Sequence, residues 1–106
     1  MTQTLLNVGF IPLLDCAPLV VAREKGFATA EGIELRLVRE TSWANIRDRL
    51  AIGHFEAAHV LGPMLVAASL GAGHLRVPMV TPVALNLGGN AITVSRPLWQ
   101  KMVGAG

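Results

Sequence analysis

The second half of the sequence has no acidic residue. Thirteen of the 16 Asp, Glu, Lys and Arg residues of the 106-residue chain lie between Asp15 and Glu56, and only Arg76, Arg96 and Lys101 follow. A small domain presents mostly charged and polar side chains to water, and residues 57–106 have few to present. We therefore expect this half to be covered by other protein or to belong to a larger protein.

Charge is scarce in the whole chain, and this excludes two classes of protein. Charged residues make up 15% of the sequence, hydrophobic residues make up 52%, and the mean hydropathy is +0.50. Intrinsic disorder requires low hydrophobicity and high charge, so the chain is expected to fold. The net charge of +2 is too small to predict direct binding of nucleic acid.

The longest uncharged stretches are unsuited to a membrane. Residues 77–95 cover roughly the length of a bilayer span, but they include Pro78, Pro82 and the pair Gly88-Gly89, which interrupt a helix. Residues 57–73 are shorter and contain His59 and a proline. We therefore predict no transmembrane segment.

The N-terminus lacks the basic and apolar regions of a secretory signal, which favours a cytoplasmic location. A periplasmic location would follow if the true N-terminus is missing from the sequence. The single cysteine, Cys16, excludes an internal disulfide and a cysteine-rich metal cluster.

Apolar runs and helical patterns alternate along the chain. We expect strands over residues 5–11, 33–38, 57–61, 77–85 and 91–95, and helices over residues 16–25, 43–52, 62–70 and from Pro97 onward. This order predicts an α/β fold with a mostly parallel sheet and helices on both faces, with 33–38 near an edge. The last helix begins close to the end of the sequence, so we expect the fold to be incomplete.

Local signals set the predicted helix boundaries. Asp15 and Ser42 are expected to cap the first two helices, because their side chains can accept from free backbone N–H groups. Gly26 and Gly71 are expected to end helices in the left-handed conformation, and Pro63 suits a first helical turn.

The sequence contains no recognisable catalytic or cofactor motif. The pair Gly71 and Gly73 does not follow a strand, and no phosphate-binding Gly-Lys-Ser/Thr motif is present. His54, His59 and His74 fall on three different connections without the spacing of a zinc pair. We therefore predict a protein without catalysis, cofactor or metal.

The predicted strand ends offer a different kind of site, because ligands of open α/β sheets collect at carboxyl ends of strands and helix N-termini. Those positions are residues 12–15, 41–43, 61–63 and 86–90. Their candidate residues are small or neutral: Ser42, Gly62, Asn86, Gly88 and Asn90, with the indole donor of Trp43. His59 lies next to an apolar strand and is a further candidate. Such residues suit a small uncharged ligand or a small anion. Purely structural roles remain open for the same residues. Trp43 can begin a core stripe with Ile46 and Leu50, His59 can be a hydrogen-bonded core residue, and Asn86 and Asn90 can be ordinary turn residues.

Several separated motifs resemble the nitrate/bicarbonate-type substrate-binding proteins of ABC transporters. They are Val8-Gly9-Phe10-Ile11-Pro12-Leu13, Asp15-Cys16-Ala17-Pro18-Leu19, Glu24-Lys25-Gly26-Phe27, Ser42-Trp43-Ala44 with Arg47-Asp48, Ala57-Ala58-His59 with Pro63-Met64, and Asn90-Ala91-Ile92-Thr93-Val94. The resemblance covers nearly the whole chain. It implies a type II periplasmic-binding-protein fold whose two lobes close on a small oxyanion, with residues 1–106 as the first lobe only.

The resemblance also implies a site. The indole N–H of Trp43 would donate to nitrate or nitrite, or to bicarbonate as an alternative, and Asn90 would add an amide contact. The helices beginning near Ser42 and Gly62 would offset the charge, and His59 would lie nearby. Some family members carry glutamine at the position of Asn90, and the lysine that they use comes from the other lobe.

The sequence departs from the family pattern at three other positions. Ala28 stands where an aromatic residue is usual, and Gly62 and Leu65 stand where alanine and proline are common.

The family includes two kinds of relative that predict different partners. A transport receptor would deliver the anion to an ABC transporter permease, whereas a cytoplasmic nitrate sensor would act as a regulatory module that sequesters an RNA-binding antiterminator. A weaker alternative is the thiamine-pyrimidine-synthesis enzyme branch of this fold. That branch requires a set of histidines and a cysteine-rich segment that this sequence, with three scattered histidines and one cysteine, does not show.

Overall fold

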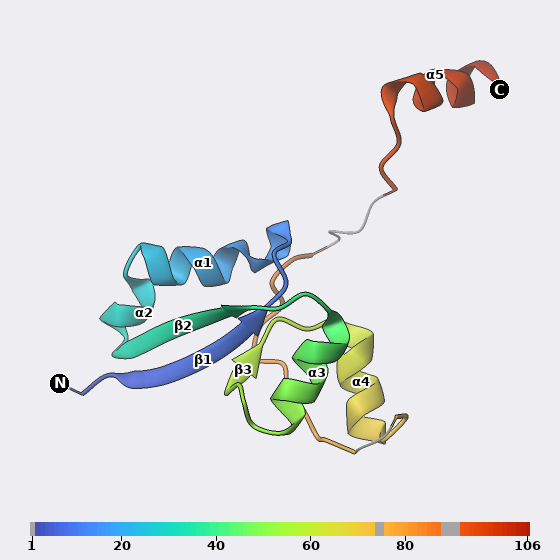
Figure 1. Cartoon of the computed structure of the whole chain (residues 1–106). Helices are drawn as coiled ribbons and strands as arrows, with labels where there is room; N and C mark the ends of the chain where they lie inside the picture. Colours follow the sequence, from blue (N-terminus) through green and yellow to red (C-terminus); the bar gives the residue numbers. More distant parts are fainter. Residues whose placement is uncertain (1, 74–75, 88–91) are drawn as a thin grey trace.

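A computed structural model describes residues 2–73, 76–87 and 92–106 (Figure 1). Its elements in chain order are β1 (Thr4–Phe10), a 3-10 helix (Leu14–Cys16), α1 (Ala17–Glu24), α2 (Phe27–Ala30), β2 (Ile33–Arg39), α3 (Trp43–Ala51), β3 (Ala57–Ala58), α4 (Gly62–Leu70) and α5 (Arg96–Gly104).

The described strands form one parallel sheet in the order β2-β1-β3. β1 pairs with β2 over seven residues, from Thr4 opposite Ile33 to Phe10 opposite Arg39, and with β3 through Val8 opposite Ala57. Side chains of β2 alternate between half-buried leucines and exposed charges over most of its length, as a strand with one covered face requires. The predicted α/β class and the edge position of residues 33–38 are confirmed.

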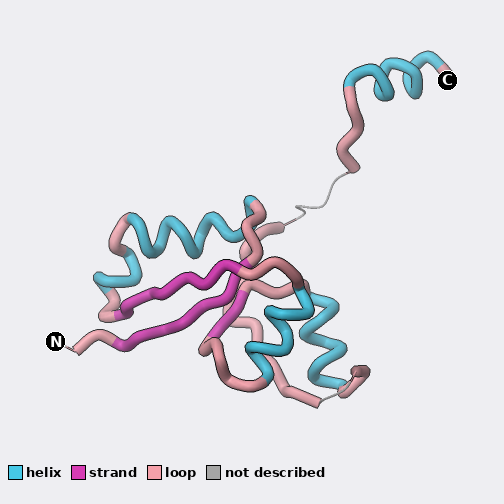
Figure 2. Tube along the Cα trace, in the orientation of Figure 1, coloured by secondary structure: helices cyan, strands magenta, loops and turns pink. Residues whose placement is uncertain are grey.

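Helices cover both faces of the sheet (Figures 1 and 2). Successive residues of β1 point to opposite faces: Gly9 faces the ring of Phe55 after α3, whereas Phe10 lines a hollow with Val20 of α1. The chain passes from β1 to β2 on one side and returns past β1 to β3 on the other. The carboxyl ends of β1 and β3 therefore form a topological switch point, where doubly wound sheets bind ligands.

The core beneath α3 is small and tightly packed. Ile46 of α3 is fully buried and Phe55 is 3% exposed. The Arg49 guanidinium lies 4.5 Å from the centroid of the Phe55 ring and pairs with the buried carboxylate of Glu40, directly after β2. These contacts fix α3 against the carboxyl end of the sheet.

Most of the predicted helix boundaries are confirmed. The Ser42 hydroxyl accepts from the backbone N–H of Asn45 at 3.1 Å, and Gly26 and Gly71 adopt positive φ values of 76° and 74°. The predicted cap at Asp15 is wrong. Asp15 lies inside the 3-10 helix, and its carboxylate accepts hydrogen bonds from side chains far along the chain instead.

The two predicted C-terminal strands are also wrong where the structure describes them. Residues 77–85 run beside α4: the N–H of Val77 donates to the Ala68 carbonyl at 2.9 Å, and that of Met79 to the Ser69 hydroxyl at 3.3 Å. Residues 92–95 form no strand, and Ala91 lies outside the described residues. A strand needs a partner with free ladder groups, and the described part of the chain pairs neither segment with β3.

The helix predicted from Pro97 is confirmed as α5, and the Ser95 hydroxyl caps it by accepting from the Leu98 N–H at 3.3 Å. α5 stands apart from the sheet in Figure 1, and the radius of gyration is 17.7 Å, against about 13 Å for a compact chain of this length. Leu98, Trp99, Met102 and Val103 of α5 are exposed. Among the described residues, no helix is long and apolar enough to span a bilayer.

Candidate functional site

Polar side chains from three distant segments meet at the carboxyl ends of β1 and β3. The Nε2 atom of His59, which directly follows β3, lies 3.1 Å from Oδ2 of Asp15, just beyond β1. The rings of His59 and Trp43 make a T-shaped contact, with centroids 5.0 Å apart and planes inclined by 78°. Asp15, His59 and Trp43 are called the switch-point cluster below.

His59 is almost fully enclosed and hydrogen-bonded on both ring nitrogens. Its side chain is 3% exposed, Nδ1 accepts from the Ile11 backbone N–H at 3.4 Å, and its own N–H donates to the Gly9 carbonyl at 2.8 Å. Because Nδ1 accepts, the ring proton is on Nε2, which donates to Asp15. Both ring nitrogens are occupied by protein, as expected for a core histidine, and a ligand contact through this ring stays a prediction.

The Asp15 carboxylate uses one oxygen for two donors. Oδ2 accepts from His59 and from Nδ2 of Asn86, which lies 3.2 Å away and 71 residues further along the chain. Oδ1 is buried and has no partner among the described residues. Buried carboxylate oxygens usually have a donor in protein or water; the two donors on Oδ2 are what hold this carboxylate at the centre of the cluster.

Trp43 combines a fixed backbone with an unused donor. It is the first residue of α3, held in place by the Ser42 cap, and its side chain is half-buried. Within the described part of the chain no acceptor bonds the indole N–H. The predicted core stripe is anchored on the fully buried Ile46, so Trp43 lies at its margin, where one face is packed and the N–H is available.

The other predicted site residues make fewer contacts with the switch-point cluster. The Ser42 hydroxyl is engaged as an acceptor by its own helix. Gly62 is the exposed first residue of α4, three residues after His59, and among the described residues no heavy atom other than those of its own helix and its chain neighbours lies within 4 Å of where a Cβ would be. α4 has no side-chain cap, so within the described part of the chain the N–H of Gly62 is a helix-end donor without an acceptor. Asn90 lies outside the described residues.

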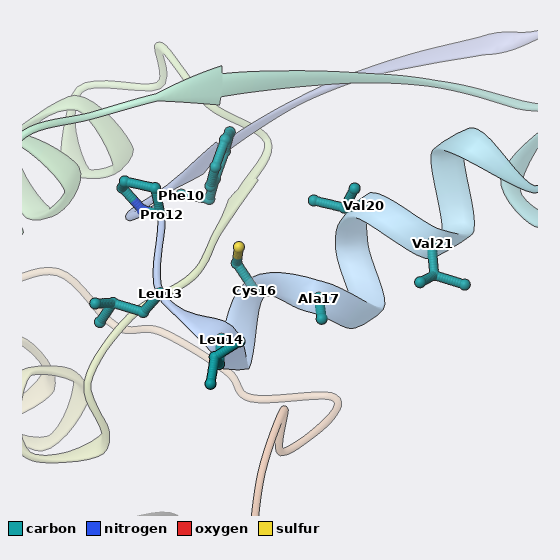
Figure 3. Close-up of a pocket in the computed structure, with 8 residues that line it drawn as sticks. All are labelled: Phe10, Pro12, Leu13, Leu14, Cys16, Ala17, Val20 and Val21. Atoms are coloured by element: carbon teal, nitrogen blue, oxygen red, sulfur yellow. The ribbon is translucent and has the colours of Figure 1, made fainter.

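An apolar hollow lies beside the cluster, between the end of β1 and α1 (Figure 3). Its volume is about 510 Å³, and its lining consists of Phe10, Pro12, Leu13, Leu14, Cys16, Ala17, Val20 and Val21. The sulfur of Cys16 points toward Phe10, whereas Leu14 and Val21 point away from the strands. With no charged side chain and no amide side chain in its lining, the hollow is unsuited to holding an anion.

Asp15 and Asn86 both lie at predicted strand ends, but the local interpretations as a helix cap and as a turn residue leave both out of the predicted ligand contacts. The strand-end position is the signal that the structure bears out for Asp15, because carboxyl ends of parallel strands converge. The contact between Asp15 and Asn86 spans 71 residues and carries no local signal.

Comparison with known proteins places these motifs in a family. The model of the NMT1-like family matches residues 1–105. The nitrate import ATP-binding protein NrtC of Synechocystis sp. is 46% identical over 93 residues, which cover 86% of this chain and 14% of that protein. The nitrate/nitrite binding protein NrtA of Nostoc sp. is 38% identical over 97 residues (87% of this chain, 21% of that protein).

A bicarbonate-binding protein and a solved structure show the same relationship. CmpA of Synechococcus elongatus is 31% identical over 105 residues, covering 93% of this chain and 23% of that protein. The crystal structure of the periplasmic nitrate-binding protein NrtA from Synechocystis superposes with a TM-score of 0.62 at 36% identity, covering 65% of this chain and 19% of that chain. The chain thus spans less than a quarter of these relatives. It belongs to the NMT1-like family, alongside nitrate and bicarbonate transport components.

Proposed function

We propose that the chain contributes one wall of a binding site for a small oxyanion, with nitrate or nitrite as the first candidate and bicarbonate as the alternative. The carrying observation is the indole N–H of Trp43 at the switch point of the sheet, which no acceptor among the described residues bonds. An anion placed there would receive this donor and the positive end of the α3 dipole. The proposed role is binding without catalysis.

The names of the relatives support this ligand class. NrtA is a nitrate/nitrite binding protein and CmpA a bicarbonate-binding protein. Because those proteins are several times longer, we propose that residues 1–106 form the first of two lobes and that the second lobe completes the site. Asn90 and the helix N-termini at Ser42 and Gly62 are the proposed additional contacts from this lobe.

The indole resonances of the chain test this proposal. The chain has two tryptophans, Trp43 and Trp99, so a ¹H–¹⁵N correlation spectrum contains two indole peaks, which the Trp99→Phe variant assigns. Nitrate, nitrite and bicarbonate are titrated against chloride at constant ionic strength. We expect only the Trp43 peak to move and to saturate in the millimolar range, about −4 kcal/mol, because one wall alone binds.

Trp99 on α5 serves as the internal control. Equal movement of both indole peaks would indicate a bulk salt effect and would overturn the proposal, as would a Trp43 peak that none of the three anions moves. Micromolar affinity in the isolated chain would contradict the two-lobe part of the proposal. The Trp43→Phe variant should lose the response of neighbouring backbone amides.

A regulatory interaction module is the second candidate, and one observation favours it. Val66 and Leu70 of α4 are 59% and 75% exposed in a half of the chain without acidic residues, as on a surface that docks against protein. A cytoplasmic sensor would use it to capture an RNA-binding antiterminator, whereas a transport receptor would engage a permease. Affinity capture followed by identification of the partner separates the two: a permease supports the receptor and an RNA-binding regulator supports the sensor.

A further inference from the structure

We propose that Asp15 and His59 are positioning residues that fix the orientation of the Trp43 indole. The contacts of the switch-point cluster carry this inference, and its consequence for ligand affinity rests on the proposed anion site. Neither residue would need to touch the ligand. Asp15 and His59 would act on the anion site indirectly, through the T-shaped contact of the His59 ring with the Trp43 indole.

Asp15 is the fixed point of the cluster. It follows β1 within a 3-10 helix, and its Oδ2 accepts from His59 after β3 and from Asn86. One carboxylate oxygen therefore ties together three segments that are far apart in the sequence. Since Oδ1 has no partner among the described residues, only one acceptor oxygen is required for this role.

The position of Asp15 determines the orientation of the His59 ring, because the ring cannot rotate without losing hydrogen bonds. The Ile11 N–H holds Nδ1 and the Asp15 carboxylate holds Nε2. A flip of the ring would place carbon atoms at both positions and break both hydrogen bonds. The backbone of His59 is also anchored, through its N–H to the Gly9 carbonyl.

Trp43 depends on this ring for its side-chain orientation. The Ser42 cap fixes where α3 begins, and with it the backbone of Trp43, but no described residue bonds the indole N–H. The T-shaped contact with His59 at 5.0 Å is the aromatic contact that limits its rotation. Loss of this contact should free the indole and weaken anion binding roughly three- to tenfold.

The test separates the hydrogen bond between Asp15 and His59 from the contact of the His59 ring with Trp43. Asp15→Ala and His59→Leu remove the hydrogen bond between the two side chains. Asp15→Asn keeps an acceptor oxygen, and His59→Gln keeps an amide that can donate toward Asp15 and accept from Ile11. Glu56→Gln is the matched control, because it weakens a contact to Asn7 in the same β1–β3 region without touching Trp43.

The first readout needs no anion. In a Trp99→Phe background, the ¹⁵N heteronuclear NOE and the chemical shift of the Trp43 indole report its order, and thermal unfolding reports stability. We expect Asp15→Ala and His59→Leu to lower the NOE and move the resonance toward that of free tryptophan. Asp15→Asn and Glu56→Gln should leave both unchanged. His59→Gln should lower the NOE as His59→Leu does, because it keeps hydrogen-bonding groups and loses the ring that contacts Trp43.

Two results would overturn the inference. One is an unchanged Trp43 indole in folded Asp15→Ala or His59→Leu chains. The other is an equal loss of order in Glu56→Gln, which would indicate general destabilisation. If Asp15→Ala does not fold, His59→Gln decides the outcome, because it keeps hydrogen-bonding groups and removes only the ring; an unchanged Trp43 indole in this variant would overturn the inference.

Nitrate titration of the same variants is the second readout, with bicarbonate in a parallel series. The positioning role predicts weakened binding in Asp15→Ala and restored binding in Asp15→Asn. If the unsubstituted chain binds neither anion while the ligand-free readout follows the expected pattern, the proposed function fails and the positioning role stands. Full affinity in a folded Asp15→Ala chain would overturn the positioning role alone.

Discussion

Replacement of Gly9 by alanine should destabilise the protein, although alanine is otherwise well accommodated in buried positions. Gly9 lies in the central strand β1 with its α-carbon against the ring of Phe55. A Cβ added there would lie 2.3 Å from Cε2, 2.7 Å from Cδ2 and 2.8 Å from Cζ of that ring. Favourable carbon–carbon contacts are about 3.5–4.0 Å, so the ring or the strand must move by roughly 1 Å.

The surroundings of Phe55 determine how much stability the Gly9→Ala substitution costs. The residue is 3% exposed, and the Arg49 guanidinium lies 4.5 Å from its ring centroid while pairing with the buried Glu40. Displacement of the ring therefore disturbs several contacts, and overpacking of this kind costs about 1–3 kcal/mol. Alanine also lowers the conformational entropy of the unfolded chain, which stabilises the folded protein by about 0.4–1 kcal/mol. We expect a net loss of about 1–2 kcal/mol.

Urea and thermal unfolding of Gly9→Ala measure this loss, and each 1 kcal/mol should lower Tm by about 4–8 °C. Gly73→Ala is the control, because apart from its chain neighbours no described residue has a heavy atom within 4 Å of its added Cβ. The double variant Gly9→Ala/Phe55→Leu should be less destabilised than the sum of the single variants, since the smaller side chain relieves the clash. A Gly9→Ala chain as stable as the unsubstituted protein would refute the reasoning.

Two further predictions concern single hydrogen bonds. Ser42→Ala removes the acceptor of the Asn45 N–H at the start of α3, so unfolding should show a loss of about 1 kcal/mol, whereas Ser42→Asp should retain the cap and most of the stability. The hydrogen bond from the Asn7 N–H lowers the pKa of Glu56 below its ordinary value of 4.5. The ionised Glu56 carboxylate therefore stabilises the fold at pH values above its unfolded pKa. This stabilisation disappears as the pH falls through the folded pKa. Glu56→Gln should flatten this part of the acid-side loss in urea unfolding between pH 6 and 3; an unchanged pH profile would contradict the assignment.

Local signals were sufficient to predict most of the helices and strands up to the end of α4. Hydrophobic alternation gave β2, and Ser42, Gly26 and Gly71 marked helix ends correctly, because capping and positive φ depend on neighbours within a few residues. The α/β class followed from the order of these elements. Each of these features is determined within a short window of sequence.

The same reasoning failed over residues 77–85 because a strand is defined by its partner. The apolar run there has the composition of a buried strand, yet Val80 is 91% exposed and the segment bonds to α4 through Val77 and Met79. β3 is paired over only two residues, so it presents little ladder to a following strand. Composition indicates that the run can form a strand, and the described sheet pairs it with no strand.

The switch-point cluster shows why a site is harder to predict than the elements that build it. Trp43, Ser42 and Gly62 are predicted because they lie where a helix begins, and His59 because it is a polar residue next to a short apolar strand. Asp15 follows β1 as well, but its helix-capping chemistry offered a local explanation that was complete in itself. The same carboxylate can serve a backbone N–H of its own helix or a histidine 44 residues away, and only the parallel pairing of β1 with β3 brings that histidine within reach. For capping residues at the carboxyl end of a parallel strand, the competing partner across the sheet should therefore be weighed before the local cap is accepted.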